Sequence, residues 1–458
     1  MKNYSKKYSS ILIFFFLLLT SFFVIGRNLD KPFIGIHDWN GARYGNIARN
    51  YIRYGFFTTK FSQIENSGGV EKKDFKFLTH YPTLLPILIS VSYRIFGISE
   101  WATRLIPLLA SSGTIVITYL ISRTIFDTKT GLLASLLAFS TPMVRYFGKN
   151  PVHEPIALFF ASLAFLGVAR LLKKEKNSWG LIYVGVTLSL LTTWSGVFLL
   201  LAISVVLFKK VNRQKIFKLW SLAFFIITFH FIKVYFDTGS FFGGGILDAL
   251  LQRTNLGRTA SLTQFTLFEF IDRVRLWSSN LFTLSLTIAS LAGLYFILKL
   301  QTSSLKRFMS GVLIYSLGYP LAFPNATFIH EYFIFYFLLP LSLLSAFAIS
   351  GIFKNKFAWF TASALLILMV WFERGDYLKA LEESSGDRLA VQIGKDLNQK
   401  ILEDDTVLIT PYAYAASRLP HLSFYSDRKI TLESNSSYNW IAEVEEKSGS
   451  YKVLPTQK

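Results

Sequence analysis

The stretch GIHDWNGARYGNIARNYIRYGF, residues 35–56, places a carboxylate and three arginines between the first two apolar segments of the chain. From Tyr44, apolar residues recur at i+3, i+4, i+7 and i+8, while Arg49, Asn50 and Arg53 share the opposite face. This pattern predicts a basic amphipathic helix that lies in the plane of a membrane interface. Taken alone, such a helix is typical of an anchor to lipid headgroups.

Asp38 is the residue of this stretch that lipid anchoring does not explain, because a carboxylate is not attracted to anionic headgroups. Pro32, Gly35 and Gly41 surround it and indicate a defined turn. The competing interpretation is structural, since an aspartate placed directly before a helix often caps its N-terminus. Asp38 is therefore a candidate functional carboxylate, with helix capping as the alternative.

The composition identifies a membrane protein. Of the 458 residues, 52% are hydrophobic and 17% are aromatic, which lies outside the range of soluble globular chains. The formal charge of +20 comes from short Lys and Arg clusters between apolar runs, as the positive-inside rule produces, so nucleic-acid binding is not predicted. The chain has no cysteine, which excludes disulfides, thiolate metal sites and cysteine nucleophiles.

Eleven apolar runs have roughly the length of a membrane-spanning helix. The first follows Lys2, Lys6 and Lys7 without a small-residue cleavage site after it, which favours a retained signal anchor over a cleaved signal peptide. A further apolar segment, residues 81–98, is predicted to be interfacial or re-entrant, because a crossing there would move the later basic clusters to the outer side. The predicted spans are residues 11–26, 104–126, 131–147, 155–172, 179–193, 195–208, 218–236, 279–299, 307–323, 332–352 and 357–373.

This topology puts the N-terminus in the cytoplasm and three segments outside the cell membrane: a first outer loop at 27–103, a second at 237–278, and the tail. The tail shows a helical pattern from Leu389 to Ile401, a strand at 406–410 and a second strand near 422–425. The predicted fold class is thus an all-α polytopic membrane domain, with about eleven transmembrane helices plus interfacial or re-entrant helices, followed by a small soluble α/β domain. The predicted domains are residues 1–374 and 375–458.

The same topology gathers the polar candidates on the outer side. Glu154 begins a span after Lys149, in the first turn where an acid is often only a partner of the helix dipole. His80 opens the re-entrant segment, and His330 with Glu331 begins another span. An isolated interfacial histidine is as often a hydrogen-bonded structural residue as a donor to phosphate or a metal ligand. The arginines of the second outer loop are predicted to meet phosphate or headgroups; they are Arg253, Arg258, Arg273 and Arg275.

Five features in this order resemble the GT-C glycosyltransferases, in the branch of the protein O-mannosyltransferases and the aminoarabinose transferases of lipid A. The resemblance covers roughly residues 10–350, and in this chain Trp39 stands where relatives often have a second acid. The matching features are Asp38 followed by Ala48-Arg49-Asn50, His80-Tyr81-Pro82-Thr83-Leu84, Phe96-Gly97-Ile98-Ser99-Glu100-Trp101-Ala102-Thr103-Arg104-Leu105, Glu154-Pro155, and His330-Glu331-Tyr332-Phe333.

The resemblance implies a hexosyl- or pentosyltransferase that moves a sugar from a polyprenyl-phosphate carrier in the membrane to a lipid, glycan or protein acceptor on the extracytoplasmic face. Asp38 would act as general base, and Glu154 as second acid or substrate orienter. Contacts to the substrate would come from His330 and Glu331. The predicted ligands of the donor phosphate are Arg43, Arg49, His80, Arg104 and Lys149.

Two alternatives stay open at this stage. Outward-facing carboxylates near His80 or His330 could bind a divalent ion, which would also assist departure of the phosphate. A transporter or flippase of lipid-linked sugars is the alternative function, although transporters tend to place charged residues and broken helices near the membrane midplane in two related halves. Here the candidates cluster at one end of the spans.

Overall fold

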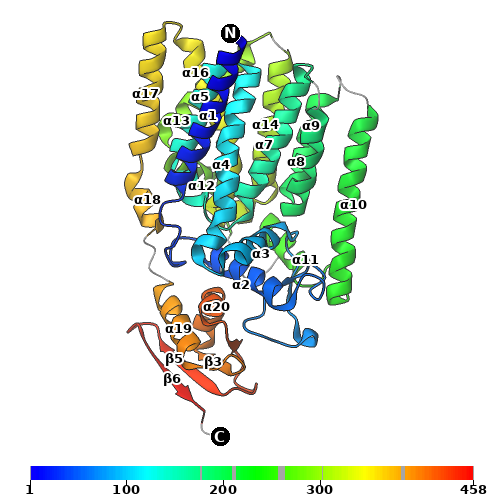
Figure 1. Cartoon of the computed structure of the whole chain (residues 1–458), viewed down its shortest axis with the longest axis vertical. Coiled ribbons are helices and arrows are strands. Elements are labelled where there is room, and N and C mark those ends of the chain that lie inside the picture. Colours follow the sequence, from blue (N-terminus) through cyan, green and yellow to red (C-terminus); the bar gives the residue numbers. More distant parts are fainter. Residues whose placement is uncertain are drawn as a thin grey trace.

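The structure is a computed structural model that describes residues 2–175, 178–208, 213–255, 264–301, 303–382 and 387–456; Arg258 lies outside these ranges. A bundle of helices fills one end of the molecule and a small domain containing a sheet forms the other (Figure 1). The bundle helices are α1 (Lys2–Ile25), α4 (Glu100–Ile125), α5 (Thr128–Ser140), α6 (Pro142–Phe147), α7 (His153–Leu172), α8 (Ser178–Thr192), α9 (Ser195–Leu207), α10 (Arg213–Thr238), α13 (Leu284–Lys299), α14 (Ser303–Ala322), α16 (Leu338–Ile352) and α17 (Lys356–Phe372).

Within the described residues, five helical segments are long and apolar enough to cross a membrane, and a sixth is counted if α12 (Leu267–Leu281) and α13, bent by 109°, form one broken span. Shorter apolar helices such as α8 and α9 accompany them. The chain is thus a multi-pass membrane protein of mainly helical fold, as the sequence predicted. The count of eleven spans stays a prediction.

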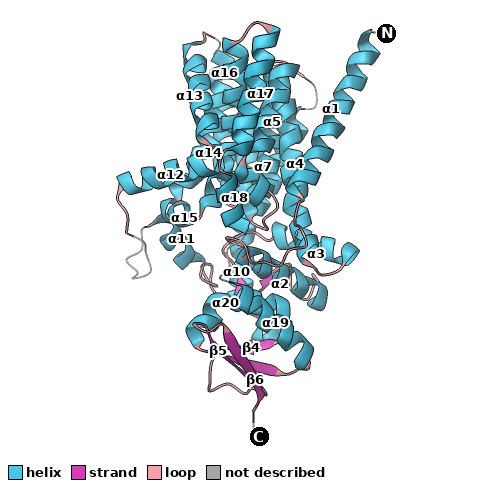
Figure 2. Ribbon diagram, turned by 90° about the vertical axis from the view of Figure 1, so that its left-hand side faces the viewer, coloured by secondary structure: helices cyan, strands magenta, loops and turns pink. Residues whose placement is uncertain are grey.

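Short elements cross the end of the bundle that faces the sheet domain (Figures 1 and 2). The segment predicted to be interfacial contains α3 (Leu84–Phe96), whose 13 residues extend about 20 Å, less than the roughly 30 Å core of a bilayer. The other elements at this end are α2 (Trp39–Tyr54), β1 (Gln63–Ile64), η1 (Lys72–Asp74), β2 (Phe77–Leu78), α11 (Ile246–Thr254), α12, α15 (Pro324–Ile329), η2 (Glu331–Phe337) and α18 (Gly375–Glu382).

The amphipathic helix α2 differs from its predicted environment. Its apolar face is buried as expected, but Asn50 and Arg49 on the polar face are buried too. The C-terminal helix α20 (Tyr412–Ser426) covers that face, so it does not lie on lipid headgroups. The reason is electrostatic: Asp427, directly after α20, supplies the carboxylate that the arginines of α2 need.

The small domain has its own apolar core, built by α19 (Arg388–Lys400), α20 and a four-stranded sheet. The strand order is β4-β3-β5-β6, with β3 parallel to both neighbours and β6 antiparallel to β5. The strand at 406–410 is confirmed. The strand near 422–425 is wrong, because its apolar run belongs to α20 and packs on α2 and the sheet. The strands are β3 (Thr406–Thr410), β4 (Lys429–Thr431), β5 (Trp440–Glu445) and β6 (Ser450–Pro455).

Candidate functional site

A cavity of ≈ 210 Å³ lies where the bundle meets the elements that cross its end. We call it the inner cavity. The start of α2, the segment after β2, the first turn of α7, α11 and the α15–η2 region each contribute to its wall. Its lining includes five residues predicted from the sequence, and these are Arg43, His80, Glu154, Arg253 and His330.

Glu154 supplies the carboxylate of the inner cavity. It lies in the first turn of α7, and the residue is only 1% exposed. Its Oε2 atom has no hydrogen-bond partner among the described residues. A buried carboxylate oxygen without a partner is costly unless a ligand satisfies it, so Glu154 is available to a donor group that enters the cavity.

Two guanidinium groups line the same cavity. Arg43 donates to Glu65 through Nε (3.2 Å) and Nη2 (2.7 Å), and Arg253 lies with its guanidinium carbon 4.4 Å from the centre of the Tyr81 ring. Arg is suited to bidentate phosphate contacts, and stacking on an aromatic ring holds its plane in place. The inner cavity therefore combines an unpaired acid with two cations.

The glycine run at 243–245 positions Arg253. Thr79 Oγ1 donates to the carbonyl oxygens of Gly243 (2.8 Å) and Gly244 (3.1 Å), which ties the run to the segment next to His80. Gly245 has a φ of +78° and begins α11, where a side chain would be strained. The glycines thus form a tight turn that sets α11, and with it Arg253, against the cavity.

His80 and His330 are neutral in this environment. Burial, with Arg253 and Arg43, lowers the pKa of His80 to about 4, and burial, with His37 and Arg253, lowers the pKa of His330 to about 3. His80 is therefore not a cation near neutral pH. Its ring makes a hydrogen bond to the Gly244 backbone, which uses the one N–H of the neutral imidazole, so His80 has an acceptor nitrogen but no free donor for a phosphate oxygen.

Asp38 lies in a separate small cavity of ≈ 30 Å³, which we call the Asp38 cavity and which Arg104 and Lys149 also line. Oδ2 of Asp38 accepts from the Gly35 backbone N–H (2.9 Å) and from Arg104 Nη2 (3.1 Å), so Oδ1 takes part in neither bond. The side chain makes no capping hydrogen bond to α2. Helix capping does not explain Asp38.

Arg104 and Lys149, the two cations of the Asp38 cavity, differ in how many backbone carbonyls they already bind. Arg104 also donates to the backbone carbonyls of Leu29, Lys31 and Pro32, so it fastens the turn before α2 to α4. Lys149 Nζ donates to the Arg27 carbonyl at 2.5 Å, and burial lowers the pKa of Lys149 to about 8. Arg104 is therefore a positioning residue.

The remaining predicted residues lie beside the two cavities. Glu331 Oε2 lies 2.9 Å from Nε2 of His37, whose ring centre is 5.1 Å from that of His330. His37 precedes Asp38, so this pair links the Asp38 turn to η2. Arg49 lines neither cavity; its Nη1 lies 3.1 Å from Asp427 in the small domain.

Several residues in or beside the inner cavity were not predicted from the sequence. Asn325 and His153 line the cavity, and His37 lies beside it, next to His330. His153 stacks on Tyr81 with ring centres 4.2 Å apart. Each of these could have been found only from proximity to a motif residue, because none has a spacing pattern of its own.

The described residues do not form a metal site. No group of three or more His, Asp or Glu side chains in this part of the chain is arranged to hold an ion. The carboxylates of Asp38 and Glu154 line different cavities, and Glu331 is paired with His37. The residues present do not fit the divalent ion considered above.

Comparison with known proteins shows which folds this structure is similar to. A family model described as dolichyl-phosphate-mannose-protein mannosyltransferase matches residues 80–235. The ArnT structure from Cupriavidus metallidurans bound to undecaprenyl phosphate superposes with a TM-score of 0.65 at 12% identity, over 93% of this chain and 86% of that chain. A search of the sequence against curated proteins finds no match.

A second solved structure shows the same likeness. The archaeal oligosaccharyltransferase AglB from Archaeoglobus fulgidus, in complex with an inhibitory peptide and a dolichol-phosphate, superposes with a TM-score of 0.58 at 16% identity. The match covers 93% of this chain and 64% of that chain, so AglB is considerably longer.

These likenesses define the class: the chain has the fold of the GT-C glycosyltransferases. It is similar to the branch that contains ArnT and the protein mannosyltransferases. The resemblance drawn from the sequence motifs is confirmed at this level.

Proposed function

We propose that this chain transfers a sugar from a polyprenyl-phosphate carrier to an acceptor hydroxyl on the extracytoplasmic face of the cell membrane, the acceptor being a lipid, a glycan or a protein. The observation that carries this proposal is the inner cavity, where a buried carboxyl group with one unpartnered oxygen and two guanidinium groups meet at one end of the bundle. That position suits a donor whose polyprenyl chain lies in the bilayer, and it does not suit transport through the midplane.

In the proposed reaction, the donor phosphate lies against Arg43 and Arg253, and the uncharged His80 is not assigned to the phosphate. Negative charge grows on the phosphate as its bond to the anomeric carbon breaks, and guanidinium groups held in place stabilise that charge. Lys149 adds positive charge from the Asp38 cavity. Arg49, directed to the small domain, has no part in this assignment.

Asp38 is the proposed general base; it lines its own small cavity, but it adjoins the inner cavity through Trp39 and Asn40, the next two residues, which line that cavity. Arg104 and the Gly35 N–H fix Oδ2, which orients the carboxylate and leaves Oδ1 to take the proton from the acceptor hydroxyl. Glu154 lies in the cavity with the guanidinium groups, so its proposed role is to hold a hydroxyl of the donor sugar. The acceptor oxygen would attack the anomeric carbon from the side opposite the phosphate, which inverts the configuration at that carbon.

The test is transfer by the purified full chain, supplied with a panel of polyprenyl-phosphate sugars. In the proposed assignment, Asp38→Asn lowers kcat by about 10²- to 10⁴-fold while donor binding is kept. Glu154→Gln mainly raises KM for the donor, because it removes a ground-state contact. Glu71→Gln is the matched control, since Glu71 is exposed and pairs only with Lys73 at the surface.

Two results would contradict the proposal. If Glu154→Gln abolishes turnover while Asp38→Asn retains it, the roles of the two acids are wrong. If the wild-type chain transfers or hydrolyses no polyprenyl-phosphate sugar of the panel, the function itself is wrong.

A further inference from the structure

A second and larger concavity lies on the far side of Arg43 from Glu154, between the helix α2 and the small domain. Its volume is ≈ 780 Å³, within the roughly 300–1,000 Å³ usual for ligand sites. One wall comes from α2 and the segment that follows it, and the other comes from α20 and β4. We call it the domain groove.

The domain groove adjoins the inner cavity. Trp39 and Arg43 line both of them, and Glu65, the hydrogen-bond partner of Arg43, lines the groove. Arg43 thus stands at the boundary, with its guanidinium held from the groove side. A molecule in the groove is adjacent to the cavity where the donor is proposed to bind.

Polar side chains on both walls define the chemistry of the domain groove. Ser417, Ser423 and Thr431 face it from the small domain, and Asn46 faces it from α2. Asn46 is 2% exposed; its Nδ2 donates to the Asn66 carbonyl (3.0 Å), whereas its Oδ1 has no partner among the described residues. Oδ1 of Asn46 is therefore a buried acceptor without a donor, and the hydroxyl of a ligand would supply that donor.

The charge of the groove is nearly balanced. Its lining carries the cations Arg43, Lys76 and Lys429 and the carboxylates Glu65 and Asp74, and Arg43 is already paired with Glu65. Neither a strongly anionic nor a strongly cationic ligand is favoured by such a wall. A neutral ligand rich in hydroxyl groups suits the serine, threonine and amide side chains.

We propose that the domain groove binds the saccharide portion of the acceptor, a neutral oligosaccharide that lies between α2 and the small domain. The proposal rests on the proposed function and names its acceptor class. Trp39 offers a broad ring at the entrance to the inner cavity. In the reaction, the terminal acceptor oxygen bonds to the anomeric carbon, the bond from that carbon to the phosphate oxygen breaks, Asp38 takes the hydroxyl proton, and polyprenyl phosphate leaves.

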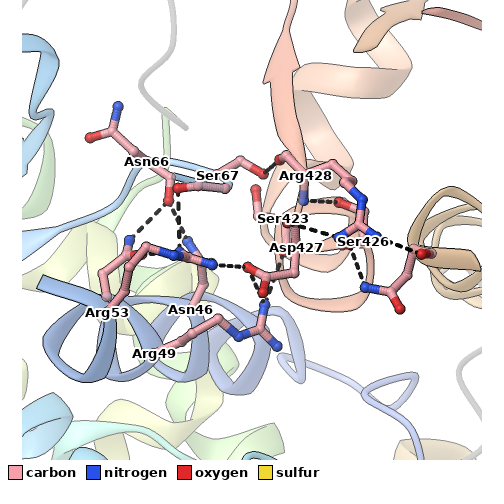
Figure 3. A network of polar contacts seen from close by, with 12 residues as sticks. Asn46, Arg49, Arg53, Asn66, Ser67, Ser423, Ser426, Asp427 and Arg428 are labelled. Atoms are coloured by element: carbon pink, nitrogen blue, oxygen red, sulfur yellow. Dashed lines mark hydrogen bonds and ion pairs between the residues drawn. The ribbon is translucent and has the colours of Figure 1, made fainter. Parts of the chain in front are cut away.

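An ionic network holds the two walls of the groove together (Figure 3). Arg53 Nη2 and Arg49 Nη1 of α2 lie 2.5 Å and 3.1 Å from Asp427, and Ser67 Oγ donates to the Arg428 carbonyl at 2.6 Å. Asn46 and Ser423 stand in the same region as these contacts (Figure 3). The groove therefore exists only while the small domain is docked, and the small domain forms one wall of the acceptor site.

The experiment blocks the groove from its exposed side. Ala416 lines it from α20 and is exposed, so Ala416→Trp fills the groove without disturbing a core. Ala413→Trp is the matched control, on the same helix, exposed and outside the groove lining. Binding of short neutral oligosaccharides, both free and linked to a short lipid, is measured on the full chain without donor; a serine- and threonine-rich peptide is the comparison probe.

The expected result is saccharide binding by the wild type and by Ala413→Trp, with Ala416→Trp at least about tenfold weaker, equivalent to about 1.4 kcal/mol. Binding of the free oligosaccharide assigns a soluble glycan, and binding of the lipid-linked form alone assigns a glycolipid headgroup. Equal binding by both tryptophan variants overturns the proposal, as does binding of the peptide alone or of none of the probes.

Donor hydrolysis to water is measured in parallel on the same three proteins. Unchanged hydrolysis in Ala416→Trp, together with lost saccharide binding, supports the groove as an acceptor site separate from the donor site. Absence of hydrolysis and transfer in the wild type contradicts the proposed function, whereas the binding result still decides the groove, because no donor is present in that measurement.

Discussion

At the scale of single residues, burial decides which charged groups can act. Asp38 and Glu154 are both buried acids, yet one is held by Arg104 and a backbone N–H and the other has an oxygen without a partner. His80 stays uncharged because desolvation and two nearby guanidinium groups oppose its protonation. The cationic part of the candidate site is therefore made by arginine and lysine.

Lys149 gives a pH prediction at this scale. Burial lowers its pKa from 10.5 to about 8, so the ammonium is positive below that pH and loses its charge above it. If the charge of Lys149 assists departure of the donor phosphate, the logarithm of kcat/KM falls by about one for each pH unit above about pH 8. Lys149→Arg keeps the charge at all these pH values and removes that alkaline limb.

The measurement is a pH profile of transfer between about pH 6 and pH 10 for both proteins. Lys72→Arg is the control, because Lys72 also lies at this end of the bundle, is exposed, and lines neither the inner cavity nor the Asp38 cavity. An unchanged alkaline limb in Lys149→Arg would falsify the assignment.

At the scale of elements, α2 connects the membrane domain to the small domain. Its first turn faces the inner cavity, its apolar face packs on α3, and its arginines meet α20. The sequence pattern identified this helix and its two faces correctly. It could not show what covers the polar face, because the partner lies about 370 residues further along the chain.

Asp427→Asn tests this connection. Asp427 has a φ of +52°, which asparagine also tolerates, so the substitution removes charge without straining the backbone. Loss of a charge-assisted bond of about 1.5–3 kcal/mol should loosen the docking of α20 on α2. Hydrogen exchange in both helices should then speed up by at least roughly tenfold.

Asp404→Asn, in an exposed turn of the same domain, is the control and should leave the exchange of α20 unchanged. Equal protection of α20 in wild type and Asp427→Asn would mean that the apolar contacts alone hold the small domain.

At the scale of the whole molecule, the two ends of the bundle differ in what they carry. The N-terminus lies at one end, while the inner cavity's elements and the small domain lie at the other (Figure 1). This arrangement agrees with the positive-inside argument, which placed the first outer loop and the tail on one side. A donor in the bilayer and an acceptor from outside would meet at that end.

Engineered cysteines test the topology, and the absence of native cysteine makes the labelling specific. Lys60→Cys and Lys447→Cys should both react with a membrane-impermeant thiol reagent added to intact cells. Lys354→Cys should react only after the membrane is opened, because this exposed residue lies at the opposite end. Labelling of positions 60 and 447 from different sides would show that the span parity is wrong.

The sequence by itself determined the membrane class, the places of most helices, the GT-C resemblance and the grouping of the candidate acids and histidines at one end of the bundle. These follow from local properties: hydrophobic run length, helical periodicity and short motifs. It failed where the outcome depends on contacts between distant segments, as for the apolar run near Leu422, which is helical because α2 and the sheet bury it.

Only the tertiary structure decided how the predicted residues are divided between the two cavities and the contact with the small domain. Glu154 joined Arg43 and Arg253 of the second outer loop in one cavity, Asp38 joined Arg104 in another, and Arg49 turned to the small domain. The physical reason is that burial, ion pairing and cavity shape arise from packing between elements distant in sequence, and no local pattern encodes which charge will meet which partner.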